Sequence, residues 1–220
     1  MAALAKIFLG LGLGWWLYVP IHELLHAGAC SATGGHVERL EIDGMYGGAL
    51  LAKIFPFVVS GSEYAGRLSG FDTGGSDLIY LATDVGPFLF TLFPGVWLLR
   101  RAVEKRRAFL FGLSLPLALA PFLSATGDAY EIGSILTTRL GPWADAASRA
   151  LLRGDDAIKK FTELRAAGPQ APWAGFGVAI ALGLCWAEAT FALGALIARR
   201  LGQRSIEPRS MSPKSGEFPG

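Results

Sequence analysis

The 220-residue chain contains no asparagine, only two cysteines and few charged residues of either sign. Because Cys30 and Cys185 both lie in apolar segments, a disulfide framework is not expected. The formal net charge is only +2, which gives no indication of a nucleic-acid partner. Charged residues make up 17% of the chain and hydrophobic residues 52%, with a mean hydropathy of +0.41. These values lie outside the usual balance of a soluble globular domain.

The hydrophobic residues fall into runs long enough to cross a bilayer, for which a helix needs about 20 residues. Four such runs cover residues 4–33, 78–99, 108–125 and 173–198. The third run is interrupted by Pro116 and Pro121, which free backbone carbonyls and kink a membrane helix. We therefore predict an α-helical polytopic membrane protein with about four transmembrane helices.

Basic residues beside these runs predict the orientation of the chain, because Lys and Arg are enriched in cytoplasmic loops. One basic cluster spans residues 100–107 and another spans residues 199–209. Placing both in the cytoplasm puts both termini inside, and the basic segment 139–172 is then outside. We expect a multi-pass integral protein of a bacterial inner (plasma) membrane. The alternative for the N-terminus is a cleaved lipoprotein signal ending at "AGAC" (Ala27–Cys30).

The segments outside the runs predict smaller elements. Residues 34–77 contain glycine-bounded, β-prone stretches, "HVERLEID" and "ALLAKIFPFVVSG", which predict a small hairpin or sheet; an ordinary loop is the alternative. Residues 142–167 have the apolar spacing of one or two amphipathic helices on the membrane surface. The polar segment 204–220 is expected to be disordered, so the membrane-embedded domain covers residues 1–203.

The first run contains an unusual polar group, "HELLH", at residues 22–26. On a helix, positions four apart share a face, so His22 and His26 can bind one zinc ion. Glu23 then lies beside the metal without binding it, and can take a proton from a metal-bound water. Two of the three histidines of the chain are in this spacing, and ionisable groups inside membrane helices usually face a functional cavity. The pattern predicts a metal site.

A catalytic zinc site needs a third protein ligand and one open position. The candidates are Asp128, Glu131 and His36, with Asp84 and Glu188 more remote. A histidine six residues after His26, as in one soluble class, is excluded because Ala32 stands there. Asp128 follows Gly127 and precedes a helical pattern, so its alternative role is that of a helix N-cap.

Taken together, the motifs resemble the site-2 protease family of intramembrane zinc metalloproteases, as a divergent member. The resemblance is carried by "HELLH" and by the glycine-rich "GGHVERLEIDGMYGG" that follows it. It is also carried by "ATDVGPFLF", which looks like the Gly-Pro segment of the family, and by "SATGDAYEIGS", at the place of its Leu-Asp-Gly motif. Together these motifs extend over about Leu4 to Leu136.

The resemblance implies one zinc ion per chain, bound by His22, His26 and Asp128, with Glu23 as the general base. It implies a membrane-associated hairpin over about Val37 to Val59. It also implies that the substrates are membrane-spanning proteins, cut near or within the lipid bilayer. The hairpin could pair with an unwound substrate strand and supply backbone hydrogen bonds that lipid cannot.

The absence of asparagine is a departure from this family, which often has one after its Gly-Pro and another before its Leu-Asp-Gly. The hydroxyl groups of Thr91, Ser124 and Thr126 stand near these places and are candidate substrate-binding donors. Gly127 stands before the aspartate in place of leucine, and Ala129 follows it in place of glycine.

Three functions are compatible with these residues. The first is a zinc endopeptidase that cleaves a membrane-spanning substrate with a metal-activated water. The second is a non-catalytic metal-binding membrane protein that acts as an escort or assembly factor. Transport along a path of histidines and carboxylates is the third, and it is disfavoured because no repeat symmetry is visible.

Overall fold

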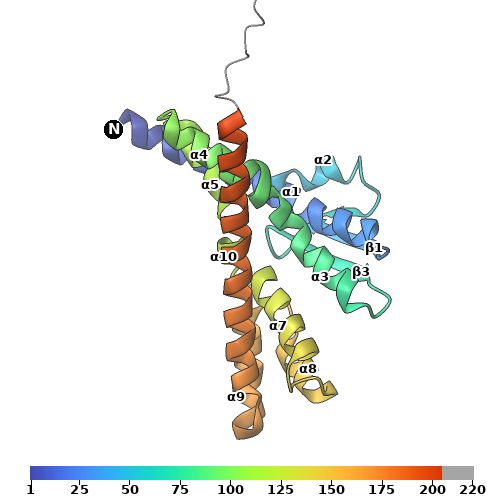
Figure 1. Ribbon diagram of the computed structural model, residues 1–220. Coiled ribbons are helices and arrows are strands. Elements are labelled where there is room, and N and C mark those ends of the chain that lie inside the picture. Colours follow the sequence, from blue (N-terminus) through green and yellow to red (C-terminus); the bar gives the residue numbers. More distant parts are fainter. Residues whose placement is uncertain (205–220) are drawn as a thin grey trace, which may run out of the picture.

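The computed structural model describes residues 1–204 and shows a mostly helical chain with one small sheet (Figure 1). The predicted disordered tail, 204–220, lies almost wholly outside the described residues. The strands are β1 (His36–Ile42), β2 (Val58–Ser60) and β3 (Gly66–Asp72). The helices are α1 (Ala2–Ala32), α2 (Gly48–Leu51), α3 (Asp77–Val85), α4 (Val96–Glu104), α5 (Ala108–Ala118), α6 (Ala120–Leu123), α7 (Asp128–Leu140), α8 (Ala146–Leu152), α9 (Ala157–Ala167) and α10 (Trp173–Arg204). Short 3-10 or π turns lie at Gly44–Tyr46, Gly86–Phe88, Thr91–Gly95 and Gly168–Gln170.

Three helices of residues 1–204 are long and apolar enough to cross a membrane. They are α1, the stretch Asp77–Glu104 that contains α3, a kink at Phe93 and α4, and the stretch Trp173–Gln203 of α10. They coincide with three of the four predicted runs. The remaining run, 108–125, forms α5 of 11 residues and then, after a break at Leu119, the single turn α6. A fourth crossing at this place stays a prediction.

The break between α5 and α6 is explained by Pro121, which has no backbone N–H to offer the carbonyl four residues earlier. That carbonyl belongs to Leu117, and it accepts a hydrogen bond from the Thr91 hydroxyl at 2.9 Å. Thr91 is fully buried. Its side chain therefore satisfies a backbone group that lipid could not satisfy.

Glycines allow α1 and α5 to pack backbone against backbone. A Cβ atom added at Gly10 would lie 2.2 Å from the Phe109 carbonyl oxygen, and one at Gly14 would lie 2.5 Å from that of Leu113. On the opposite helix, a Cβ at Gly112 would lie 2.0 Å from the Ile7 oxygen. Helices in lipid associate through such close packing between small residues.

The sheet has the strand order β2-β1-β3 and packs against α1. The expected hairpin over Val37–Val59 is wrong, because β1 and β2 run parallel. After β1 the chain passes through α2 and returns to the end of the sheet where β1 began, so that β2 can start there. A tight hairpin turn cannot make such a crossover. The antiparallel partner of β1 is β3, which the sequence did not predict. Leu40 and Ile42 of β1 are fully buried, in a core shared with Ala27 of α1.

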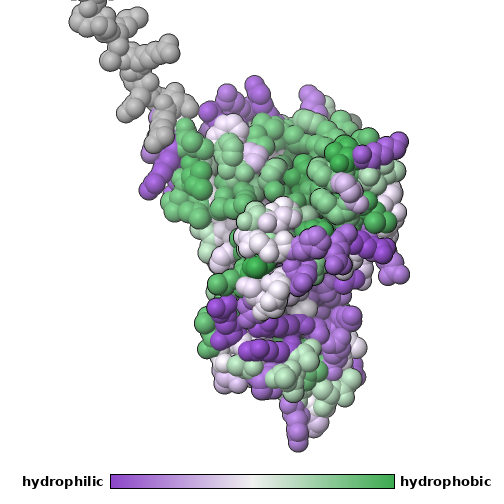
Figure 2. All heavy atoms as spheres, turned by 90° about the vertical axis from the view of Figure 1, so that its right-hand side faces the viewer, coloured by the Kyte–Doolittle hydropathy of each residue, from purple (hydrophilic) through white to green (hydrophobic). Residues whose placement is uncertain are grey.

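Helices α8 and α9 occupy the segment predicted to hold amphipathic helices. Asp145 caps α8 by accepting from the Ser148 N–H at 2.9 Å, and Asp156 caps α9 by accepting from Ile158 and Lys159. Leu152 of α8 and Leu164 of α9 are buried with Tyr130 of α7. Figure 2 shows hydrophobic side chains across the upper part of one face and hydrophilic ones across the lower part, the level at which Figure 1 places α8 and α9.

The contact between α1 and α5 makes a matched test possible. We expect Gly10→Ala to lower the stability of the protein by about 1–3 kcal/mol, because the new methyl group overlaps a backbone carbonyl. Gly12→Ala, on the same helix with no atom within 4 Å of the added Cβ, should leave stability unchanged or raise it. Thermal unfolding in detergent micelles measures both variants. Equal melting temperatures for the two would contradict this packing.

Candidate metal centre

Three predicted ligands converge at one point. His22 and His26 project from α1, and Asp128 is the first residue of α7. The His22 Nε2 atom lies 3.0 Å from Asp128 Oδ2, the His26 Nε2 atom lies 3.5 Å from Asp128 Oδ1, and the two Nε2 atoms are 3.1 Å apart. Within residues 1–204 these residues form the one group of three potential metal ligands whose ligand atoms all lie within 4.8 Å of one another.

These distances fit a zinc ion. Ligand atoms at about 2.0–2.1 Å from a tetrahedral zinc lie roughly 3.3 Å from each other, close to the three distances observed here. Two imidazole nitrogens and one carboxylate oxygen are a known ligand set of catalytic zinc sites, which keep a fourth position open. The residues present therefore fit a zinc ion and leave room for a water molecule.

Neighbouring groups orient each ligand. The His26 Nδ1 atom lies 2.8 Å from the Thr83 carbonyl oxygen, which can only accept a hydrogen bond. Nδ1 of His26 must then carry the proton, so its Nε2 atom offers a lone pair to the site. The Tyr18 hydroxyl lies 2.7 Å from Nδ1 of His22. Ser124 donates from its hydroxyl to Asp128 Oδ2 at 2.6 Å and accepts from the Asp128 N–H at 3.1 Å.

The Asp128 carboxylate is held in its charged form. Burial alone would raise its pKa, but His26 and His22, when their imidazoles are protonated, hold that pKa well below its usual range through charge and hydrogen bonds. The alternative role of Asp128 as a helix cap is not observed, because Gly127 occupies the N-cap position of α7. Its side chain is directed instead to the two histidines.

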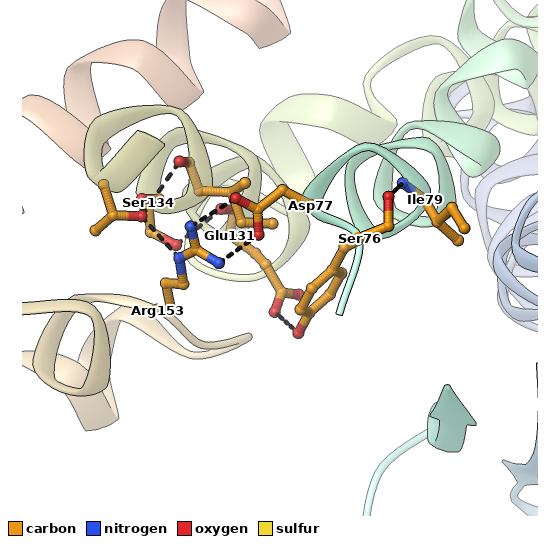
Figure 3. A network of polar contacts seen from close by, with 9 residues as sticks. Ser76, Asp77, Ile79, Glu131, Ser134 and Arg153 are labelled. Atoms are coloured by element: carbon orange, nitrogen blue, oxygen red, sulfur yellow. Dashed lines mark hydrogen bonds and ion pairs between the residues drawn. The ribbon is translucent and has the colours of Figure 1, made fainter. Parts of the chain in front are cut away.

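Polar contacts hold α3 against α7, which carries Asp128 (Figure 3). Arg153, which follows α8, forms a two-pronged ion pair with Asp77 at 2.6 and 3.0 Å. The same guanidinium donates through Nε to the Thr138 hydroxyl of α7 at 2.7 Å. Tyr80 of α3 donates its hydroxyl proton to the Glu131 carboxylate of α7. Because α3 also supplies Thr83 to His26, these contacts connect both sides of the metal centre.

A cavity of about 510 Å³ lies beside the candidate ligand group, of which His26 and Asp128 line it. His26, Asp128 and Glu23 line it together with residues of β3 and the segment 154–159. Glu23 is half-buried beneath β3, where a Cβ atom at Gly66 would lie 2.5 Å from the Glu23 Cγ atom. The Glu23 carboxylate also interacts with the backbone of Leu68. Close packing by a strand without a side chain at residue 66 thus fixes Glu23 at the cavity wall.

The other candidate residues are placed differently. Thr126 lines the cavity, whereas Ser124 donates a hydrogen bond to the Asp128 carboxylate. Thr91 does not line the cavity, and its hydroxyl donates to the Leu117 carbonyl. Of the alternative ligands, His36 is exposed at the start of β1, and Glu131 is buried in the cavity wall, outside the group of three.

Two positioning groups, Tyr18 and Thr83, were not predicted from the sequence. Tyr18 precedes His22 by four residues, a spacing that places both on one helix face, so this signal was available. Thr83 acts through its backbone carbonyl, which leaves no mark in the sequence.

No protein-family model, curated protein or solved structure matches this chain. The interpretation of the site therefore depends on its residues and their geometry.

The zinc affinities of single-residue variants should show whether the three proposed residues, and not the alternative ligands, bind the metal. We expect His22→Ala, His26→Ala and Asp128→Ala each to weaken zinc binding by more than about 100-fold, since changes even to the outer partners of a metal site cost 10–100-fold. His36→Ala and Glu131→Gln should keep the wild-type zinc affinity. Competition with a chelating dye, on protein purified in detergent, measures these affinities. Wild-type affinity in Asp128→Ala would show that the third ligand is another residue.

Proposed function

We propose that the protein is an intramembrane zinc endopeptidase that cleaves a membrane-spanning protein by attack of a metal-activated water. The single observation that carries this proposal is the position of Glu23, a half-buried carboxylate that lines the same cavity as His26 and Asp128, two members of the candidate ligand group. A site that only stores or carries a metal has no need of an additional carboxylate next to an open position.

A zinc ion bound by the three ligands would supply a Lewis acid and bring the pKa of a bound water to about 7. The protein residues have separate tasks in this scheme. Glu23 accepts the proton of the attacking water and delivers it to the nitrogen of the departing amine. Tyr18, Thr83 and Ser124 keep the ligands in one orientation. Thr126 lines the cavity with an exposed hydroxyl and is a donor available to the substrate.

The position of strand β3 is an argument that the substrate is a peptide. It pairs with β1 on one side and forms the edge of the sheet on the other. Residues Gly66–Ser69 and Phe71 of this strand line the cavity that also contains Glu23. An extended segment can add to such an edge through backbone hydrogen bonds. This pairing would satisfy the backbone groups of a substrate helix that unwinds in an apolar environment.

The general-base role of Glu23 predicts a separation of binding from cleavage. We expect Glu23→Gln to bind zinc as the wild type does, yet to lower peptide-bond hydrolysis by about 100- to 10,000-fold, the usual contribution of a general base. The measurement compares new protein termini in membranes that contain either form, by mass spectrometry of labelled N-termini.

The matched control is Glu188→Gln, because Glu188 is an exposed carboxylate of α10 that does not line the cavity. This variant should cleave like the wild type. If the Glu23→Gln membranes contained the same new termini as the wild type, the protease proposal would fail and a non-catalytic metal-binding role would be favoured.

A further inference from the structure

A carboxylate that the metal centre does not use lies in the wall of the same cavity. Asp84, near the end of α3, is 3% exposed. Its Oδ2 atom is buried and has no hydrogen-bond partner within residues 1–204. Buried polar atoms are almost always satisfied, and a buried unpaired carboxylate is strongly unfavourable. An orphaned carboxylate oxygen in a cavity wall therefore indicates a place for a donor that arrives from outside the chain.

The charges around Asp84 define the kind of donor. The charged groups that act on its carboxylate are Glu131, Asp128 and Asp155, all of them negative. Asp128 is engaged by the two histidines, and Asp155 pairs with Arg67 at 3.0 Å. Glu131 is 5% exposed, and Tyr80 satisfies one of its oxygens. Asp84 and Glu131 are thus two buried carboxylates of one cavity wall, and neither forms an ion pair with a lysine or arginine within residues 1–204.

The lysine and arginine side chains that line the cavity do not form an ion pair with Asp84. Arg67 is held by Asp155, and both Arg67 and Lys159 are exposed at the rim of the cavity. Within residues 1–204, the acidic wall around Asp84 therefore receives no charge compensation from the lysine and arginine side chains that line the cavity.

We propose that Asp84 and Glu131 form a subsite that receives a lysine or arginine side chain of the substrate close to the cleaved bond. This inference rests on the proposed peptidase function, because the subsite and Glu23 share one cavity. An ammonium or guanidinium group fits two carboxylates, since it can donate N–H hydrogen bonds to both. A bound Ca²⁺ or Mg²⁺ would require about six oxygen ligands. Residues 1–204 contain no group of three metal ligands that includes Asp84.

A subsite for a basic side chain restricts the expected substrates to membrane segments that contain a lysine or arginine. Lysine and arginine are rare inside membrane helices, because their charge is costly in lipid. A membrane segment with one basic residue near the cut would gain affinity on transfer of that residue from lipid to the Asp84–Glu131 subsite. We infer that such segments are preferred over purely apolar ones.

The experiment measures binding without cleavage. The probes are two capped pentapeptides, acetyl-Ala-Val-Xaa-Val-Ala-amide, in which Xaa is lysine or norleucine, an uncharged analogue that lacks the ammonium group. Zinc-loaded Glu23→Gln protein in lipid nanodiscs binds each peptide, and calorimetry gives the dissociation constants. We expect the lysine peptide to bind at least tenfold more tightly. Asp84→Asn or Glu131→Gln, each added to Glu23→Gln, should reduce this preference to less than threefold and leave norleucine binding unchanged.

Two controls keep the result interpretable. Glu188→Gln, added to the same background, removes a carboxylate away from the cavity and should preserve the full preference. Zinc content, measured on each variant, shows that Asp84→Asn and Glu131→Gln are folded. Equal binding of the two peptides, or a preference that survives Asp84→Asn, would overturn the subsite.

Failure of the subsite and failure of the peptidase are distinguishable. Cleavage that depends on Glu23, together with equal binding of lysine and norleucine peptides, would reject the subsite alone. A preference for lysine that depends on Asp84, in a protein whose wild-type form cuts nothing, would reject the peptidase function and retain a site for basic peptides.

Discussion

Two imidazoles of α1 and one carboxylate of α7 meet within 3.0–3.5 Å of each other, in a chain with three long apolar helices within residues 1–204. This contact connects segments that are far apart in sequence, and the other elements are arranged around it. Helix α3 supplies the carbonyl that orients His26, and α5 packs through glycines against the first half of α1. A cation bound at this point would balance the half-buried carboxylate, because an unpaired charge removed from water is strongly destabilising.

The sheet gives the metal centre its second wall. Leu40 and Ile42 pack β1 against α1. Because β3 pairs with β1, it lies above Glu23, and the edge of β3 that faces away from β1 is unpaired. Gly66 permits the close approach, since any side chain there would meet the Glu23 carboxylate stem. The cavity between β3 and α7 is rich in carboxylates, and this polar interior in a membrane-type chain is consistent with a place for water and for an unwound peptide.

The parts of the structure that the sequence predicted are those that depend on local spacing. Histidines four residues apart share a helix face, and long apolar runs form long helices, so the convergence of His22 and His26 and the presence of three long apolar helices agree with the sequence prediction. Long-range contacts explain the errors. Strand β3 contains Gly66 and Gly70, which lower its strand propensity but allow the contacts with Glu23 and Arg39. The Thr91 hydroxyl donates to the Leu117 carbonyl, which Pro121 leaves without a helical partner. This hydrogen bond depends on how the helices pack, so the sequence alone does not predict it.

X-ray absorption spectroscopy of the zinc-loaded protein tests the central claim most directly, namely that His22, His26 and Asp128 bind one zinc ion. The account predicts four nitrogen or oxygen ligands at about 2.0–2.2 Å, with the outer-shell scattering of two imidazoles and with one of these imidazoles lost in His26→Ala. A sulfur ligand at about 2.3 Å, or a spectrum without imidazole scattering, would contradict it.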